Sequence, residues 1–96
     1  MQEQRLYLIL LENGLPLTFD AIERHVAHLK ALDEEGKLFA CGPFTDYPGG
    51  MVLVRAASLG EAHGVAQRDP FIKDGYKTYS IRTVDWANKE NNYGVE

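Results

Sequence analysis

The chain has 96 residues, enough for one domain, which we place over residues 1–96 with a core at about 5–86 and a polar tail at 87–96. Fourteen acidic against ten basic residues give a net charge of −4, which disfavours nucleic-acid binding, and scattered basic residues disfavour a membrane-surface patch. The apolar run Leu6–Leu11 is too short to cross a bilayer, so we expect a cytoplasmic protein. The lone Cys41 excludes an internal disulfide, a CxxC redox pair and a structural zinc site.

The first third of the chain predicts a strand followed by a helix. The stretch Arg5–Leu11 is apolar almost without a break, which is typical of a buried strand, and it stops at the turn signal Asn13–Pro16. The following helix should span about Phe19–Glu35. Its N-terminus can be capped by Thr18 or by Asp20, because either side chain offers an oxygen to an unpaired backbone N–H.

Two strands, a helix and a last strand follow. Lys37–Phe44 reads as a strand that ends at Pro43, since proline has no amide proton for the sheet. A turn then leads into a third strand at Met51–Ala56. Residues Ser58–Arg68 predict a helix with its serine as the N-cap, and Lys77–Val84 predicts a strand rich in β-branched and aromatic residues. The polar tail after them is expected to be loose.

The order β-α-β-β-α-β indicates an α+β, ferredoxin-like fold, an antiparallel sheet with two helices on one face. A strand as apolar as Leu6–Leu11 must also bury its other face. A second copy of the sheet is the simplest cover, so we expect two chains to pair face to face as a dimeric α+β barrel.

Two residues suggest chemistry. On a helical projection His25 lies inside the apolar stripe of the first helix, with His28 at its edge. Such a histidine is either a core side chain with satisfied nitrogens or a proton carrier. Asp69 precedes Pro70, which indicates a cap on a short helical turn, and the same geometry presents an ionised carboxylate. Beside a buried histidine, that carboxylate would complete an acid–base dyad.

The other candidates are weaker. The two histidines of the first helix lie one turn apart but lack a third ligand, so we expect no metal. We interpret His63 as a surface residue and Cys41 as a buried, inert thiol, because nothing cationic adjoins it in sequence. Tyr7 and Phe44 are placed to form the walls of a ring-binding cleft.

The spacing of several residues resembles the YCII (YciI-like) domain family from about Leu6 to Trp86. The matching positions are His25, Gly36, Leu38, Gly42-Pro43, Gly50, Ser58, Glu61-Ala62, Asp69-Pro70-Phe71 and Gly75. The resemblance implies a ferredoxin-like fold paired as a dimeric α+β barrel. It also implies a cleft at the boundary of sheet and helix, where His25 and Asp69 form the active site and Gly42 and Pro43 line the pocket.

The family includes a dehydrochlorinase that acts on chlorinated hydroxyquinols, and related barrels include muconolactone isomerase. The resemblance therefore implies a cofactor-independent lyase or isomerase that acts on a small oxygenated ring, with His25 as general acid/base and Asp69 as the carboxylate that orients it. The alternative is a non-catalytic dimeric binding or accessory domain in which both residues are structural. Cofactor-free oxygenase chemistry, known in related barrels, has no distinct residue signature in this chain.

The chain departs from the family pattern at one position. The family often carries an arginine three residues before the histidine, whereas this sequence has Ile22 there and Arg24 directly before the histidine. An arginine from a strand, Arg5, Arg55 or Arg82, could take the place of the missing one.

Overall fold

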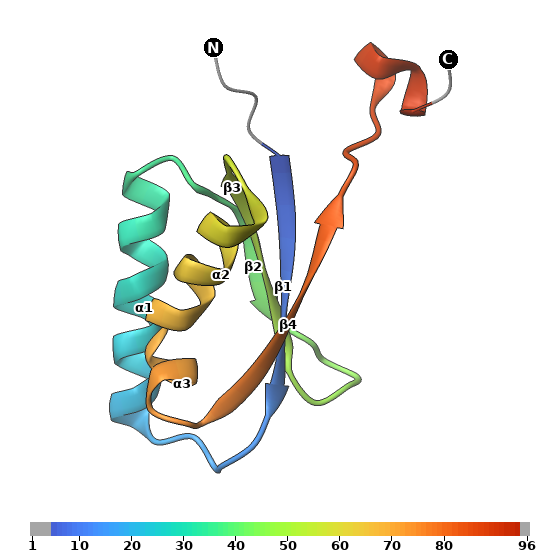
Figure 1. Cartoon of the computed structure of the whole chain (residues 1–96). Coiled ribbons are helices and arrows are strands. Elements are labelled where there is room, and N and C mark those ends of the chain that lie inside the picture. The colour runs from blue at the N-terminus through green and yellow to red at the C-terminus, as the bar shows by residue number, and fades with distance from the viewer. Residues whose placement is uncertain (1–4, 95–96) are drawn as a thin grey trace.

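A computed structural model describes residues 5–94 of the chain, so the first four residues and the end of the predicted tail lie outside it. The elements are β1 (Arg5–Asn13), α1 (Phe19–Glu34), β2 (Leu38–Pro43), β3 (Gly50–Ala56), α2 (Leu59–Arg68), α3 (Pro70–Lys73), β4 (Lys77–Val84) and the 3₁₀ helix η1 (Lys89–Gly94). Figure 1 shows α1, α2 and α3 on one side of the sheet. The α+β, ferredoxin-like order predicted from the sequence is confirmed, with α3 as a short addition.

The sheet is antiparallel with the order β2-β3-β1-β4, so the apolar β1 is central. Leu8 pairs with Leu53 on one side and with Arg82 on the other. Because side chains alternate along a strand, this row lies on the face without helices. The next row, which contains Ile9 and Val52, lies under the helices. The two faces of β1 therefore meet different surroundings.

Side-chain caps set the start of each long helix. Thr18 accepts a hydrogen bond from the Ala21 N–H and begins α1, which decides between the two predicted caps. Ser58 accepts from the Glu61 N–H and begins α2 as predicted. Each cap satisfies a backbone donor that the helix itself cannot pair, and this fixes where the helix begins.

The core lies between the helices and the sheet. Its buried members come from all of these layers: Tyr7, Ile9, Leu11, Ala21, Leu32, Val52, Val54, Ala56, Ala62, Val65, Ala66 and Phe71. Small alanines on α2 let that helix approach the strands, and Val54 and Val65 are almost fully buried. Burying these side chains supplies the main driving force for folding, at about 25 cal/mol per Å² of apolar surface.

The segment after β4 shows local order of its own. The last segment, expected to be loose, contains η1, because the side chains of Asn88 and Asn91 accept hydrogen bonds from nearby backbone N–H groups. This segment projects beyond the sheet (Figure 1). Within residues 5–94, no helix combines the length and the apolar character needed to span a membrane.

Candidate functional site

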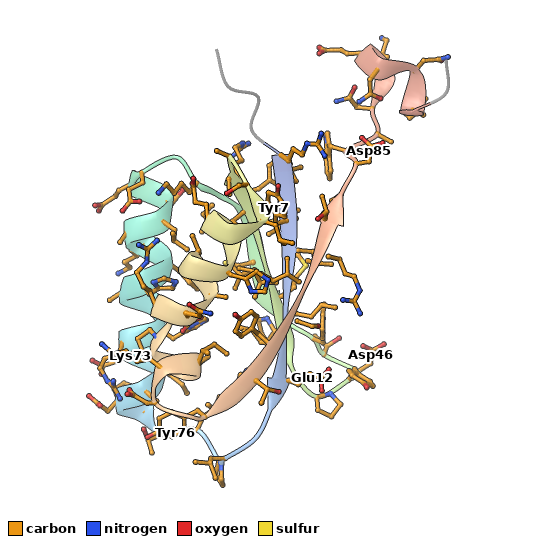
Figure 2. The ribbon with its side chains drawn as sticks, viewed as in Figure 1. Tyr7, Glu12, Asp46, Lys73, Tyr76 and Asp85 are labelled. Carbon is orange, nitrogen blue, oxygen red and sulfur yellow. The ribbon has the colours of Figure 1, made fainter. Side chains whose placement is uncertain are left out.

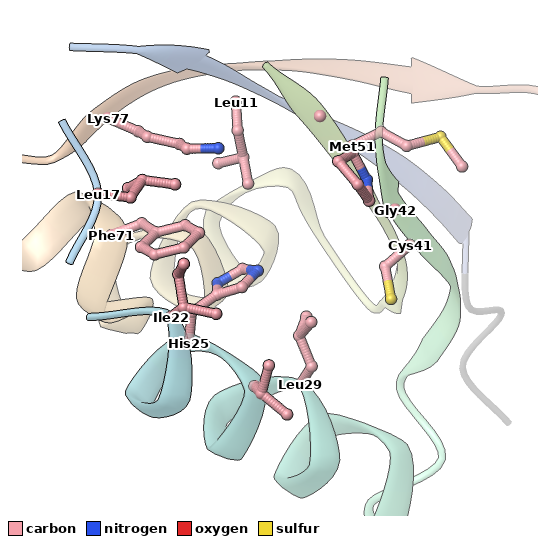
Figure 3. A pocket seen from close by; sticks show the side chains of 13 residues that line it. Leu11, Leu17, Ile22, His25, Leu29, Cys41, Gly42, Met51, Phe71 and Lys77 are labelled. Carbon is pink, nitrogen blue, oxygen red and sulfur yellow. The ribbon is translucent and has the colours of Figure 1, made fainter. Parts of the chain in front are cut away.

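An apolar cavity of about 470 Å³ lies between α1 and the sheet, near the end of β1 that is followed by the first turn. Volumes of this order are typical of small-molecule sites. Figure 3 shows the side chains that line it from both layers. The lining residues are Leu11, Leu17, Ile22, His25, Val26, Leu29, Cys41, Gly42, Pro43, Gly50, Met51, Phe71 and Lys77.

His25 projects from α1 into this cavity (Figure 3). Its ring stacks on Phe71 of α3, with centroids 3.9 Å apart and planes 10° from parallel. Only 13% of the His25 side chain is exposed. The aromatic contact and the burial hold the imidazole in one orientation, so one ring edge faces α3 and the other faces the cavity.

Asp69 is the buried partner of this histidine. It stands between α2 and α3, where its Oδ1 accepts the Phe71 N–H at 3.0 Å and caps α3. The same oxygen lies 2.8 Å from Nδ1 of His25. The sequence predicted both a cap and a dyad partner at this position, and the structure shows a geometry that serves both.

The pair fixes which imidazole nitrogen faces a bound molecule. An ionised carboxylate only accepts hydrogen bonds, so Nδ1 of His25 must carry the proton and donate it to Asp69. In the neutral ring, Nε2 then bears the lone pair. No residue in the described part of the chain bonds Nε2, which leaves this nitrogen able to accept or return a proton at the cavity wall.

His28 has a different environment from the first histidine. It is half-buried one turn further along α1 and does not line the cavity. Burial of its ring lowers the pKa of His28, and the negative charge of Asp69 opposes this shift. Over residues 5–94, no three His, Cys, Asp or Glu side chains gather in an arrangement that could hold a metal ion.

The four residues predicted to bind substrate fall into two groups. Gly42 and Pro43, at the end of β2, line the cavity. Tyr7 does not, because it lies in the core four residues before Leu11 on β1, about 13 Å along an extended strand (Figure 2). Phe44 follows β2, is exposed, and is absent from the lining.

The expectation of a buried thiol at Cys41 is wrong. Cys41 pairs with Val52 and therefore points to the helix side, but β2 is the edge strand and the thiol is exposed toward the cavity. The expectation that His63 is a surface residue is also wrong. Its Nδ1 lies 2.9 Å from the hydroxyl of Tyr79, and the ring is half-buried between α2 and β4.

The arginines lie away from the cavity. Arg24 bonds Asp20 on its own helix and Asp74 after α3, so it ties these elements together. Arg5 and Arg55 line a separate, more polar hollow near Trp86, and none of these three appears in the lining of the His25 cavity. The positive charge at the cavity comes instead from Lys77, the first residue of β4.

Sequence reasoning missed Lys77, although a signal was present. Lys77, Tyr79 and Ile81 alternate along β4, so the lysine shares the face of the apolar pair. A lysine at an inward position is unusual because burying an ammonium is costly. Burial lowers the pKa of Lys77, and Asp69 opposes the shift.

Comparison with known proteins agrees with this architecture. The YCII-related domain matches residues 7–86. The uncharacterized protein YjpA of Bacillus subtilis (strain 168) is 30% identical over 84 residues, 88% of this chain and 96% of that protein. The chain is also similar to a solved structure, that of 5-chloro-2-hydroxyhydroquinone dehydrochlorinase (TftG) from Burkholderia phenoliruptrix AC1100 in complex with 2,5-dihydroxybenzoquinone. The two structures superpose with a TM-score of 0.64 at 24% sequence identity, and the match covers 91% of this chain and 98% of that chain. The last likeness is one of fold.

Proposed function

The chain belongs to the YCII-related domain family, and we propose that it is a cofactor-independent enzyme of the lyase or isomerase type that acts on a small molecule. His25 is the general acid/base, and Asp69 orients its ring. The observation that carries the proposal is the 2.8 Å contact between Nδ1 of His25 and Oδ1 of Asp69 at the wall of an apolar cavity. A cytoplasmic location, expected from the sequence, is part of this proposal.

The proposed chemistry uses the free nitrogen of His25. In an isomerisation, Nε2 takes a proton from one atom of the substrate and returns it to another, so the balance closes within the substrate. In an elimination, Nε2 takes the proton and the leaving group departs with the electron pair of its bond, for a net loss of HCl from a chlorinated ring. The negative charge of Asp69 stabilises the imidazolium formed in either case, and positioned proton transfer of this kind contributes about 10²–10⁴ in rate.

The proposed substrate is a small oxygenated ring. Apolar side chains such as Leu11, Val26 and Leu29 line most of the cavity, which suits the faces of a flat ring. Gly42 and Pro43 contribute backbone surface at one end. The solved dehydrochlorinase of the same fold is named for a chlorinated hydroxyhydroquinone and holds 2,5-dihydroxybenzoquinone. These two compounds are therefore the first to test on this chain.

The test is chloride release from 5-chloro-2-hydroxyhydroquinone by purified protein. We expect wild type to release chloride and His25→Gln to lose at least about 100-fold in rate, since the proton carrier is gone. His63→Gln is the matched control, because His63 bonds Tyr79 outside the cavity. Release no faster than the uncatalysed reaction with wild type, or equal rates for wild type and His25→Gln, would contradict the proposal.

A non-catalytic binding domain is the second candidate, and one observation favours it. Oδ1 of Asp69 also caps α3 through the Phe71 N–H, so the buried carboxylate has a structural task without any reaction. In this alternative the imidazole of His25 only completes the hydrogen bonding of the cap. The two candidates differ in how activity and stability respond to changes at Asp69.

We also propose that two chains pair through the open face of the sheet. The helices cover one face only (Figure 1), and the other carries Leu6, Leu8 and Leu10 of β1 beside Met51 and Leu53 of β3. Leu6 and Leu53 are already buried in the single chain, and a second sheet would remove the half-buried Leu8, Leu10 and Met51 from water. Light scattering should report a dimer for wild type and a monomer for Leu8→Lys. Ala27→Lys, on an exposed position of α1, should remain dimeric. A monomeric wild type would contradict the pairing.

A further inference from the structure

Lys77 is a largely buried residue whose ammonium group reaches the cavity and is not itself sealed from solvent. The residue is 9% exposed, and its side chain runs from the start of β4 toward the cavity (Figure 3). Nζ lies 4.8 Å from the centre of the Phe71 ring. Throughout residues 5–94, no hydrogen-bond acceptor or ion-pair partner meets this ammonium group. The aromatic ring is thus its one close contact of electrostatic character.

Such a group needs an acceptor. An ammonium has three N–H donors and is strongly hydrated in water, so one that has lost part of its hydration and meets no acceptor of the protein favours an anionic partner. Lys37 shows the ordinary solution in this chain, since its Nζ lies 3.3 Å from a carboxylate oxygen of Glu35 and the side chain is more exposed. Burial also lowers the pKa of Lys77. An anion that enters the cavity would supply the missing acceptor.

Lys77 is the charged group at the cavity that remains available to bind an anion. Asp69 is the nearest negative group, but its Oδ1 already accepts from His25 and from the Phe71 N–H. The other lining side chains are apolar except for the imidazole of His25 and the thiol of Cys41. Among the lining side chains of the described residues, Lys77 is the one that carries an ammonium group.

We propose that Lys77 binds a negatively charged oxygen of the substrate, and that the cavity therefore takes small, flat, anionic molecules such as ionised hydroxyquinones rather than their neutral ethers. This inference rests on the proposed function, because it places the substrate in the cavity of His25. Lys77 and His25 both line this cavity, so one small molecule bound there can meet both groups. Lys77 would bind the anionic oxygen, while Nε2 of His25 accepts or returns the transferred proton.

The test compares two quinones of nearly the same shape. The hydroxyl groups of 2,5-dihydroxybenzoquinone are vinylogous acids and are ionised at neutral pH, whereas 2,5-dimethoxybenzoquinone has no proton to lose. Calorimetric titration of wild type should give tighter binding of the dihydroxy compound. Lys77→Met keeps the length of the side chain and removes the charge, so it should weaken that binding about 10- to 100-fold, the range for a hydrogen bond to a charged group. Binding of the dimethoxy compound should change less than about threefold.

Lys73→Met is the matched control, since Lys73 is exposed at the end of α3 and does not line the cavity (Figure 2). It should bind both quinones as wild type does. If Lys77→Met does not fold, an NMR titration of the wild-type protein tests the inference instead. The NMR signal of the Lys77 Cε–Hε group should shift on addition of the dihydroxy compound and stay in place with the dimethoxy compound.

Three results would overturn the inference: binding of neither quinone to wild type, equal binding of both, or unchanged binding of the dihydroxy compound to Lys77→Met. The outcome is separable from that of the proposed function. If chloride release depends on His25 while Lys77→Met binds normally, the acid–base proposal stands and the anion site falls. If Lys77→Met loses the dihydroxy compound while His25→Gln retains full activity, the anion site stands and the acid–base proposal falls.

Discussion

His25 and Asp69 are joined through an atom that also holds the backbone. Oδ1 of Asp69 lies 2.8 Å from Nδ1 of His25 and accepts the Phe71 N–H at 3.0 Å. The ring of His25 in turn stacks on the side chain of Phe71. The start of α3 therefore fixes the carboxylate and the imidazole at once, and the charge of Asp69 can be separated from its hydrogen bonds by mutation.

Asp69→Asn should remove the charge and keep the geometry. The amide oxygen can accept both donors, and the Phe71 N–H selects the oxygen rather than the NH₂ group for this position. We expect the free energy of unfolding to fall by less than about 1 kcal/mol. Activity should fall about 100-fold or more, because the imidazolium loses its stabilising charge. Urea unfolding and the chloride-release assay measure the two effects.

Asp69→Ala is the contrasting variant, since it removes the cap and the partner of His25 together. The free energy of unfolding should fall by about 1–3 kcal/mol, the usual cost of a lost cap or an unpaired buried donor. Equal stability losses for the Asn and Ala variants would show that the charge itself holds the fold. Full activity in both variants would favour the non-catalytic binding domain.

His28 should make the fold sensitive to acid. Burial lowers the pKa of His28 below its usual value of about 6.5, with Asp69 opposing the shift and His25 and Arg68 adding to it. The unfolded chain then takes up the proton more readily than the folded chain. This contribution to stability is complete above about pH 6.5 and is lost as the pH falls through the pKa of the folded state.

The measurement for this prediction is thermal unfolding of wild type and His28→Gln between pH 5 and pH 8. Glutamine does not titrate, so the variant should lose less stability on acidification than wild type. Parallel curves for the two proteins would show that His28 does not contribute.

The fold was predictable because its signals are local. β4 begins and ends where alternation and composition place it, at Lys77–Val84. Pro43 ends β2 because it has no N–H to donate, and Ser58 begins α2 by capping it. Each of these features depends on a few neighbouring residues. The exact choice of Thr18 as the cap of α1 needed the structure, because two adjacent side chains could serve.

The site was predictable only in part, because its contacts join distant segments. The helical projection places His25 on the inner face of α1, but its contact with Asp69 crosses 44 residues and depends on how α1 packs against α3. The walls depend on which part of the sheet the helices leave uncovered. The cavity opens near Leu11 rather than Tyr7, and it exposes the edge-strand thiol of Cys41.

Lys77→Met should stabilise the free protein. Burial lowers the pKa of Lys77, so near neutral pH the unfolded chain holds this proton more favourably than the folded chain. Removing the charge should raise the free energy of unfolding by about 1 kcal/mol. The gain should shrink at pH values above the pKa of the folded state, where the lysine is neutral. Lys73→Met should stay within about 0.5 kcal/mol of wild type. Urea unfolding at pH 7 and pH 10 tests this, and a destabilised Lys77→Met would contradict it.

Gly49 is required where the chain enters β3. Its φ of +116° lies in a region that L side chains rarely adopt, and a Cβ there would stand 2.2 Å from the carbonyl oxygen of Leu11. Gly49→Ala must therefore push β3 away from β1, beside the cavity. We expect a loss of at least about 2 kcal/mol in the free energy of unfolding, measured by urea unfolding.

Gly42 gives the matched comparison for this substitution. It also lies beside the cavity, but a Cβ built on it meets nothing within 4 Å and its backbone is not left-handed. Gly42→Ala should therefore cost less than about 0.5 kcal/mol. Its methyl group would point to the helix-free face, because Gly42 pairs with Met51, so binding of 2,5-dihydroxybenzoquinone should stay as in wild type. If both alanine variants were equally stable, the close approach of Gly49 to Leu11 would not be what holds this edge of the cavity in place.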